Sequence, residues 1–153
     1  METGILGSIK KEFGLKEVRV NEYSPLTLAF IGDCVFDLVV KTVVVETANC
    51  PANVLHKRTS NIVKANSQSR MAQWFVENDI LSPEELSVFK RGRNAKSNTM
   101  AKNSSVGDYR RATGVEALIG YLYLNDRCER IVELIKLGMN VTLEKDSHKQ
   151  TAK

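Results

Sequence analysis

A long apolar stretch interrupted by a single acidic side chain constrains this sequence more than any other feature. Residues 26–36 are apolar on nearly every face of a helix, and Asp33 is their only charge. A helix that is apolar all round is buried, so Asp33 is expected in or beside the core unless it occupies a narrow exposed strip. A buried carboxylate is costly unless it is protonated, paired or bound to a cation. Gly32, beside it, indicates that another backbone approaches closely.

A second segment repeats this pattern. Residues 112–124 contain one charge, Glu116, among apolar side chains and the small residues Gly114 and Gly120, which allow a second helix to approach. If this helix packs against the one that carries Asp33, two carboxylates meet, and like charges at close range raise a pKa or require a divalent cation. Oxygen ligands without histidine or cysteine favour Mg²⁺. The spacing alone leaves open whether the two acids meet.

The other candidates for chemistry have simpler interpretations. Asp37 lies one helical turn after Asp33, but Lys41 follows it by four residues, which favours a surface ion pair. The two histidines, His56 and His148, have no evident nucleophile as a partner. The three cysteines are far apart in the sequence and fit neither a disulfide framework nor a zinc site, which favours reduced thiols.

The helical signals predict an all-α chain of about five main helices in one domain, 1–153. Ser24-Pro25 is typical of a helix start, and Ser82 with Glu85 is typical of a capping box. The expected helices span about 25–46, 53–78, 83–91, 106–124 and 126–138. The ordered core is expected over about 20–143, and the polar tail 144–153 is expected to fray.

No feature of the sequence suggests a membrane protein. No apolar run reaches the roughly 20 residues of a membrane span, and no secretory signal is visible near the N-terminus. We therefore expect a cytoplasmic protein with no membrane partner and no organic cofactor.

The excess positive charge lies in the middle of the chain. Residues 51–112 hold 11 basic and 5 acidic side chains, whereas residues 1–50 hold 5 and 7. This distribution is typical of a patch that binds a polyanion, although a solvated basic face is the alternative. The candidate RNA-binding residues are Lys57 and Lys64, expected on one helix face, Arg91, Arg93, Asn94 and Lys96, expected in a loop, and Arg110. With few aromatic residues nearby, double-stranded RNA fits better than a single strand.

Two motifs resemble those of the ribonuclease III family. The run Phe30-Ile31-Gly32-Asp33 resembles the motif that opens the family's active-site helix, and Glu116-Ala117-Leu118-Ile119-Gly120 resembles its second acidic motif. The run from Arg91 to Ser97, Arg-Gly-Arg-Asn-Ala-Lys-Ser, resembles the short branch called Mini-ribonuclease III. The resemblance extends from about Leu26 to Gly138, nearly the whole chain.

The resemblance implies an all-α, homodimeric, Mg²⁺-dependent endoribonuclease that cuts double-stranded RNA. It implies that Asp33 and Glu116 are the catalytic, metal-binding acids, and that the substrate is the precursor of large-subunit (23S) ribosomal RNA. Dimerisation also suits the helix from residue 26 to 45, which is too apolar for a small monomer to cover easily.

The sequence departs from full-length family members in three respects. Ala29 and Thr113 stand where those members carry acids, so the resemblance leaves two of four carboxylates, as it does in the short branch. We expect no double-stranded-RNA-binding domain after Gly138, so the nuclease domain itself is expected to bind the substrate, and the stretch from Arg91 to Lys96 is the natural candidate.

Two rival interpretations remain beside the endoribonuclease. One is a catalytically inactive RNA-binding module of the same fold that acts in ribosome assembly, but retention of both Asp33 and Glu116 favours the enzyme. The other is a helical DNA-binding protein, which gives no reason for a buried acid pair.

Overall fold

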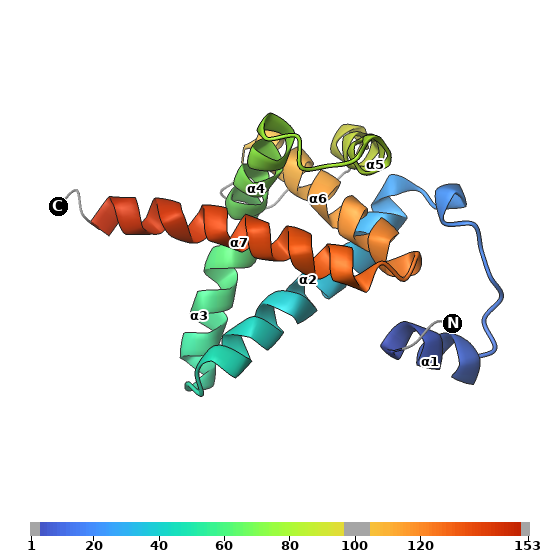
Figure 1. Cartoon of the computed structure of the whole chain (residues 1–153), viewed down its shortest axis with the longest axis horizontal. Helices are drawn as coiled ribbons and strands as arrows, with labels where there is room; N and C mark the ends of the chain where they lie inside the picture. The colour runs from blue at the N-terminus through green and yellow to red at the C-terminus, as the bar shows by residue number, and fades with distance from the viewer. Residues whose placement is uncertain (1–3, 97–104, 151–153) are drawn as a thin grey trace.

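The computed structural model describes residues 4–96 and 105–150 and is all-helical over these ranges, which confirms the predicted fold class (Figure 1). Seven α-helices, rather than about five, follow one another: α1 Ile5–Glu12, α2 Pro25–Thr47, α3 Ala52–Val63, α4 Ala65–Glu77, α5 Pro83–Asn94, α6 Val106–Leu124 and α7 Cys128–Gln150. A short 3₁₀ turn, η1 Val20–Glu22, precedes α2. None of the helices in the described part of the chain is both long and apolar enough to span a bilayer.

Helices α2 and α6 cross at the centre of the molecule in close contact (Figure 1). A methyl group placed on Gly32 would lie 1.7 Å from the carbonyl oxygen of Glu116, and one on Gly120 would lie 1.9 Å from that of Leu28. Only glycine allows two backbones to approach so closely. The glycines that the sequence pairs with the two lone acids therefore set the spacing of these helices.

The other helices complete the core around this crossing. Helices α4 and α5 pack on α6, α3 packs on α2, and α7 runs across α4 and α6. The side chains that fill the core are apolar and almost fully buried: Leu28, Phe36, Val40, Met71, Phe75, Phe89, Leu118, Leu122, Leu134 and Ile135. The central helices are thus covered on most of their faces, as their apolar composition requires.

The predicted helix over 53–78 is wrong, because the chain breaks at Lys64. That residue adopts extended backbone angles (φ −62°, ψ 153°) and ends α3 while it precedes α4. The hydroxyl of Ser67 donates to the carbonyl oxygen of Asn61 across the break, at 2.7 Å. The face shared by Lys57 and Lys64 was inferred from one continuous helix, so that inference fails too.

The predicted loop from Arg91 begins later than expected. Helix α5 continues to Asn94, because Gly92 packs tightly on α6: a methyl group there would lie 2.7 Å from the Cβ of Ala117. Arg91, Arg93 and Asn94 are therefore helical rather than loop residues. Ala95 and Lys96 follow the helix as non-helical residues, as predicted, and the end of the predicted loop, residues 97–98, lies outside the described residues.

The two ends of the chain are more helical than predicted. Helix α7 extends to Gln150, past the expected end near Gly138 and through most of the tail expected to fray. At the other end, α1 lies beside the body of the molecule (Figure 1), where its buried Leu6 lines a groove with Ile31 and Tyr123.

Candidate active site

The two lone acids come together at the crossing of α2 and α6. Asp33 follows Gly32, whose backbone lies against the carbonyl group of Glu116, so the two side chains leave the same contact point from opposite helices. Burial, then the negative charge of Asp33, raises the pKa of Glu116 from 4.5 to about 8. Burial, then the charge of Asp37, also raises the pKa of Asp33. The sequence left this convergence open, and the structure shows it.

The acids are not equally buried, which corrects one expectation. Asp33 is exposed and faces solvent at the side of α2, whereas Glu116 is half-buried. Asp37 forms the predicted surface ion pair with Lys41, at 3.5 Å. The pair of acids is thus open to solvent through Asp33 and closed off by protein behind Glu116, an arrangement that lets a substrate approach from one side.

Gln68, in the first turn of α4, is a third polar group of this site. Its amide forms a hydrogen bond to the Glu116 side chain that partly offsets the rise in the pKa of Glu116. The side chain is only 1 % exposed, and its Oε1 atom has no hydrogen-bond partner among the described residues. The sequence analysis missed this role. The available signal was the position of Gln68 on the same helical face as Met71 and Phe75, three and seven residues later.

The donor set fits a hard divalent cation such as Mg²⁺. It consists of two carboxylates, with the buried amide of Gln68 beside Glu116, and Mg²⁺ binds through one or two carboxylates while keeping several waters. Among the described residues, no cluster of three or more acidic, histidine or cysteine side chains exists. At the positions where full-length family members have acids, Ala29 is buried and the Thr113 hydroxyl donates to the carbonyl oxygen of Tyr109, at 3.0 Å.

Comparison with known proteins decides the family. The ribonuclease III domain model matches residues 26–127, a range that contains both acids. The chain belongs to the ribonuclease III family. The Mini-ribonuclease 3 of Thermoanaerobacter sp. (strain X514) is 43% identical over 144 residues, covering 94% of this chain and all of that protein. The Mini-ribonuclease 3 of Staphylococcus aureus is 40% identical over 122 residues, 80% of this chain and 91% of that protein.

A solved structure supports the same assignment. The crystal structure of a Fusobacterium nucleatum protein superposes with a TM-score of 0.71 at 29% sequence identity, covering 79% of this chain and 95% of that one. Together with the curated relatives, these matches confirm the predicted resemblance to the Mini-ribonuclease III branch. As a member of the ribonuclease III family, the chain is an endoribonuclease, and the family acts on double-stranded RNA.

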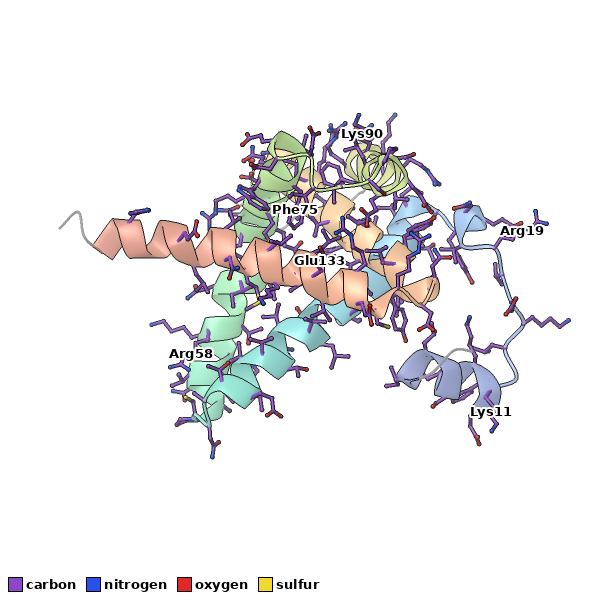
Figure 2. The ribbon with its side chains drawn as sticks, in the orientation of Figure 1. Lys11, Arg19, Arg58, Phe75, Lys90 and Glu133 are labelled. Atoms are coloured by element: carbon purple, nitrogen blue, oxygen red, sulfur yellow. The ribbon has the colours of Figure 1, made fainter. Side chains whose placement is uncertain are left out.

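The basic residues predicted for RNA binding fall into two groups on this ribonuclease III fold. Lys57 lies on α3, and Lys64 at its end, whereas Arg91 and Arg93 lie on the last turn of α5. Figure 2 shows the neighbouring side chains far apart, with Arg58 on α3 at the lower left and Lys90 on α5 at the top. The acid-bearing helices lie between these groups, since α2 contacts α3 and α6 contacts α5.

The second group, called the α5 group below, consists of Arg91, Arg93, Lys96 and the neighbouring Arg110 of α6. Part of it is held in place by α5 itself. The guanidinium of Arg93 lies over the Phe89 ring, 5.8 Å from its centroid, and its Nε donates to the Asn94 side chain at 3.2 Å. Arg91, Lys96 and, on α6, Arg110 are exposed. The group therefore combines one oriented cation with three that are accessible to a polyanion.

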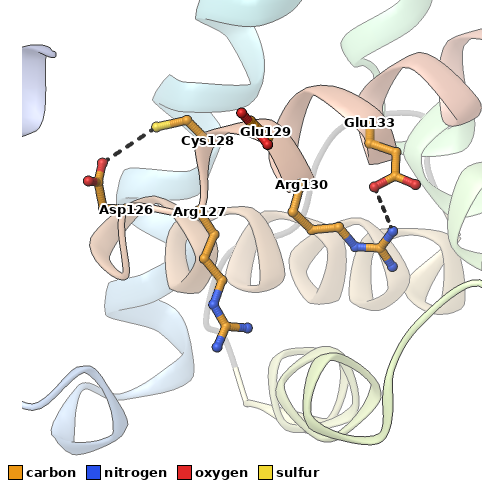
Figure 3. Close-up of a pocket in the computed structure, with 6 residues that line it drawn as sticks. All are labelled: Asp126, Arg127, Cys128, Glu129, Arg130 and Glu133. Atoms are coloured by element: carbon orange, nitrogen blue, oxygen red, sulfur yellow. Dashed lines mark hydrogen bonds and ion pairs between the residues drawn. The ribbon is translucent and has the colours of Figure 1, made fainter. Parts of the chain in front are cut away.

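A polar pocket at the start of α7, separate from the acid pair, has a structural role (Figure 3). Arg130 donates to Glu85 of the α5 capping box at 2.8 Å and pairs with Glu133 at 3.0 Å, while Arg127 lies 3.6 Å from Glu84. Although burial raises the pKa of Glu85, the hydrogen bonds from Arg130 and Ser82 hold it below its ordinary value. The two arginines thus pair with carboxylates of α5 and α7 and hold the start of α7 against α5.

Proposed function

We propose that this ribonuclease III family member hydrolyses phosphodiester bonds of double-stranded RNA with Mg²⁺, as a homodimer, and matures the precursor of 23S ribosomal RNA. The observation that carries the proposal is the meeting of Asp33 and Glu116 beside solvent. Burial and the negative charge of Asp33 make ionisation of Glu116 costly, and a cation held by the two acids would offset that cost. The 23S precursor is the substrate that the resemblance to the short branch implies.

In this proposal the two acids have distinct surroundings. When bound between them, Mg²⁺ would supply positive charge to the reacting phosphate and lower the pKa of water to the range where it attacks. Asp33, exposed on α2, meets the solvent side, where the RNA backbone arrives. Glu116 is fixed from behind by α6 and Gln68, so it holds its orientation as the substrate changes.

Cleavage of a defined duplex tests the proposal. A defined double-stranded segment of the 23S precursor is incubated with the full chain and Mg²⁺, with EDTA in a parallel sample and with the unpaired strands as substrate control. Products of discrete length should appear only with the duplex and Mg²⁺. Equal cleavage in EDTA would contradict the metal, and equal cleavage of the separate strands would contradict the double-stranded substrate.

The homodimer is supported by an apolar stripe on the exposed face of α2. Leu26, Phe30 and Leu38 recur at multiples of four residues, and Phe30 is 78 % exposed although it lies three residues before Asp33. A large aromatic side chain left in water beside an active site is typical of an interface. A twofold axis along this stripe would bury it and bring two active sites near each other.

Replacing Phe30 with aspartate is expected to convert the dimer into monomers. Each interface of a twofold dimer contains the residue twice. Loss of one central aromatic residue typically raises the dissociation constant of the dimer by about 30-fold or more. Analytical ultracentrifugation over a concentration series measures the change. Val132→Asp, which places the same charge at an exposed apolar position of α7, is the matched control. A Phe30→Asp variant that sediments as the wild type does would refute this interface.

The α5 group is expected to bind RNA phosphates. Arg91→Ala combined with Arg93→Ala should weaken duplex binding and reduce the slope of log K against log salt by about one to two units, since each lost phosphate contact removes one released counterion. Binding measured with a catalytically blocked background at several salt concentrations gives the slope. Lys16→Ala with Lys136→Ala removes two exposed charges elsewhere and should leave it unchanged. Equal slopes in both variants would place the RNA contacts on other residues.

A further inference from the structure

Gln68 is the most deeply buried polar side chain next to the acid pair. It is 1 % exposed, its amide is hydrogen-bonded to Glu116, and its Oε1 finds no partner among the described residues. Leaving a buried amide oxygen unsatisfied costs about 1–3 kcal/mol. A smaller or apolar side chain would avoid that cost, so the presence of the amide calls for an explanation outside folding.

The backbone that carries Gln68 is anchored on both sides. The hydroxyl of Ser67 donates to the carbonyl oxygen of Asn61 at 2.7 Å, and the hydroxyl of Ser69 donates to Asp108 of α6 at 2.7 Å. The Nε of Arg111 in turn donates to the Ser69 hydroxyl at 2.7 Å. The first bond joins the start of α4 to α3, and the other two join it to α6, the helix of Glu116. The amide of Gln68 therefore has a fixed position relative to that carboxylate.

We propose that Gln68 is a positioning residue of the metal site, whose amide N–H orients the Glu116 carboxylate and whose Oε1 accepts a hydrogen bond from the hydration shell of the bound cation. The inference rests on the proposed metal-dependent function and assigns the chemical role of a residue behind the acids. A hydrated Mg²⁺ ion carries water protons on its outer side, and a buried carbonyl oxygen is the acceptor that such protons need.

A neutral amide suits this place better than a further acid. Glu116 is already half-buried and faces Asp33, so a third carboxylate would increase the repulsion whenever the cation is absent. Glutamine supplies one donor and one acceptor without charge. It can thus hold Glu116 in the free protein and the hydration shell in the loaded one, a role that the internally bonded Thr113 hydroxyl does not fill.

Metal binding without RNA tests the inference. Mn²⁺ binding to the full-length chain is measured by electron paramagnetic resonance for wild type, Gln68→Met and Gln68→Glu, with thermal melting as the fold control. Gln73→Met, on the exposed face of the same helix, is the matched control. Gln68→Met should bind Mn²⁺ about tenfold or more weakly, as is usual when a residue behind a metal ligand is removed. Its Mg²⁺ midpoint for cleavage should rise in parallel, while KM for the duplex stays unchanged because Gln68 is buried.

Gln68→Glu separates a positioning role from a packing role. It retains an oxygen acceptor and adds a negative charge, but it loses the N–H donor to Glu116, so it should bind Mn²⁺ more tightly than Gln68→Met does. A packing role predicts the reverse order, since a buried extra charge disturbs folding more than the apolar methionine does. Wild-type Mn²⁺ affinity in Gln68→Met, or weaker binding by Gln68→Glu than by Gln68→Met, would overturn the inference. If Gln68→Met does not fold, comparison of Gln68→Glu with the wild type decides.

The same measurement distinguishes failure of the inference from failure of the proposed function. If Asp33→Asn and Glu116→Gln abolish Mn²⁺ binding while Gln68→Met leaves it intact, only the role of Gln68 is lost. If neither acid affects Mn²⁺ binding, the proposed metal site itself is wrong.

Discussion

Asp33→Asn is expected to abolish cleavage of duplex RNA while the variant still folds and binds the duplex. The substitution keeps the volume of the side chain and removes a negatively charged oxygen ligand. Because a bound metal contributes several kcal/mol to the transition state of phosphodiester hydrolysis, the rate constant should fall by about 10³-fold or more. Single-turnover cleavage with saturating enzyme measures this loss, and filter binding measures the retained affinity. Glu116→Gln should have a similar effect on the rate.

The pH dependence of folding stability provides an independent check on the role of Glu116. In the metal-free protein the pKa of Glu116 is raised from 4.5 to about 8, so the folded state binds the proton more tightly than the unfolded state does. Glu116 therefore has no effect on stability below about pH 4.5 and destabilises the fold progressively as the pH rises toward 8. Glu116→Gln removes that penalty, so in EDTA it should be more stable than the wild type by a margin that grows over this interval.

Two outcomes would contradict this assignment. Normal cleavage by Asp33→Asn would show that Asp33 is no metal ligand. A Glu116→Gln variant that is less stable than the wild type in EDTA at pH 8, measured by urea denaturation, would show that the carboxylate is stabilised by the fold rather than strained by it.

Gly32→Ala is expected to damage both stability and activity. The added methyl group would lie 1.7 Å from the carbonyl oxygen of Glu116, a backbone atom that cannot rotate away. The helices α2 and α6 would have to separate, at a cost at or above the upper end of the about 1–3 kcal/mol usual for overpacked cores. We expect a decrease in melting temperature of about 10 °C. Cleavage should fall even where the variant is folded, because Asp33 and Glu116 move apart with their helices.

Gly107→Ala is the matched control for this substitution. Gly107 also lies in α6, but a methyl group there would meet only the flexible side chain of Arg111, at 3.5 Å. Alanine is the better helix former, so this variant should be as stable as the wild type or slightly more stable. Equal melting temperatures for Gly32→Ala and Gly107→Ala would contradict the close helix crossing described above.

The parts of the fold that sequence could predict are those that local chemistry determines. Ser24-Pro25 defined the start of α2. In the predicted capping box, the backbone N–H of Glu85 donates to the Ser82 hydroxyl at 3.2 Å, and the backbone N–H of Ser82 donates to the Glu85 carboxylate at 2.9 Å. The two lone acids were recognised because each lies in an apolar helix. Their meeting could only be confirmed from the structure, because it depends on how α2 and α6 cross.

The errors arose where tertiary contacts override local signals. Nothing near Lys64 breaks a helix by itself, and the bend is stabilised by the bond from Ser67 to the Asn61 carbonyl oxygen. Gly92 looked like a loop residue, yet α5 continues through it because its missing side chain lets it pack on α6. The sequence suggested Gln68 only as a donor to RNA, because its place on the buried face of α4 beside Glu116 depends on how α4 packs against α6.

The close packing of Gly92 against α6 affects how a bound duplex would be positioned. Arg91 and Arg93 flank this glycine, and it rests on Ala117, the residue after Glu116. The cations and the acid thus lie on two helices in direct contact, whose separation is set by a missing methyl group. If these arginines hold a duplex, it would meet Glu116 at a constant offset along its backbone, and that offset would determine the position of the cut.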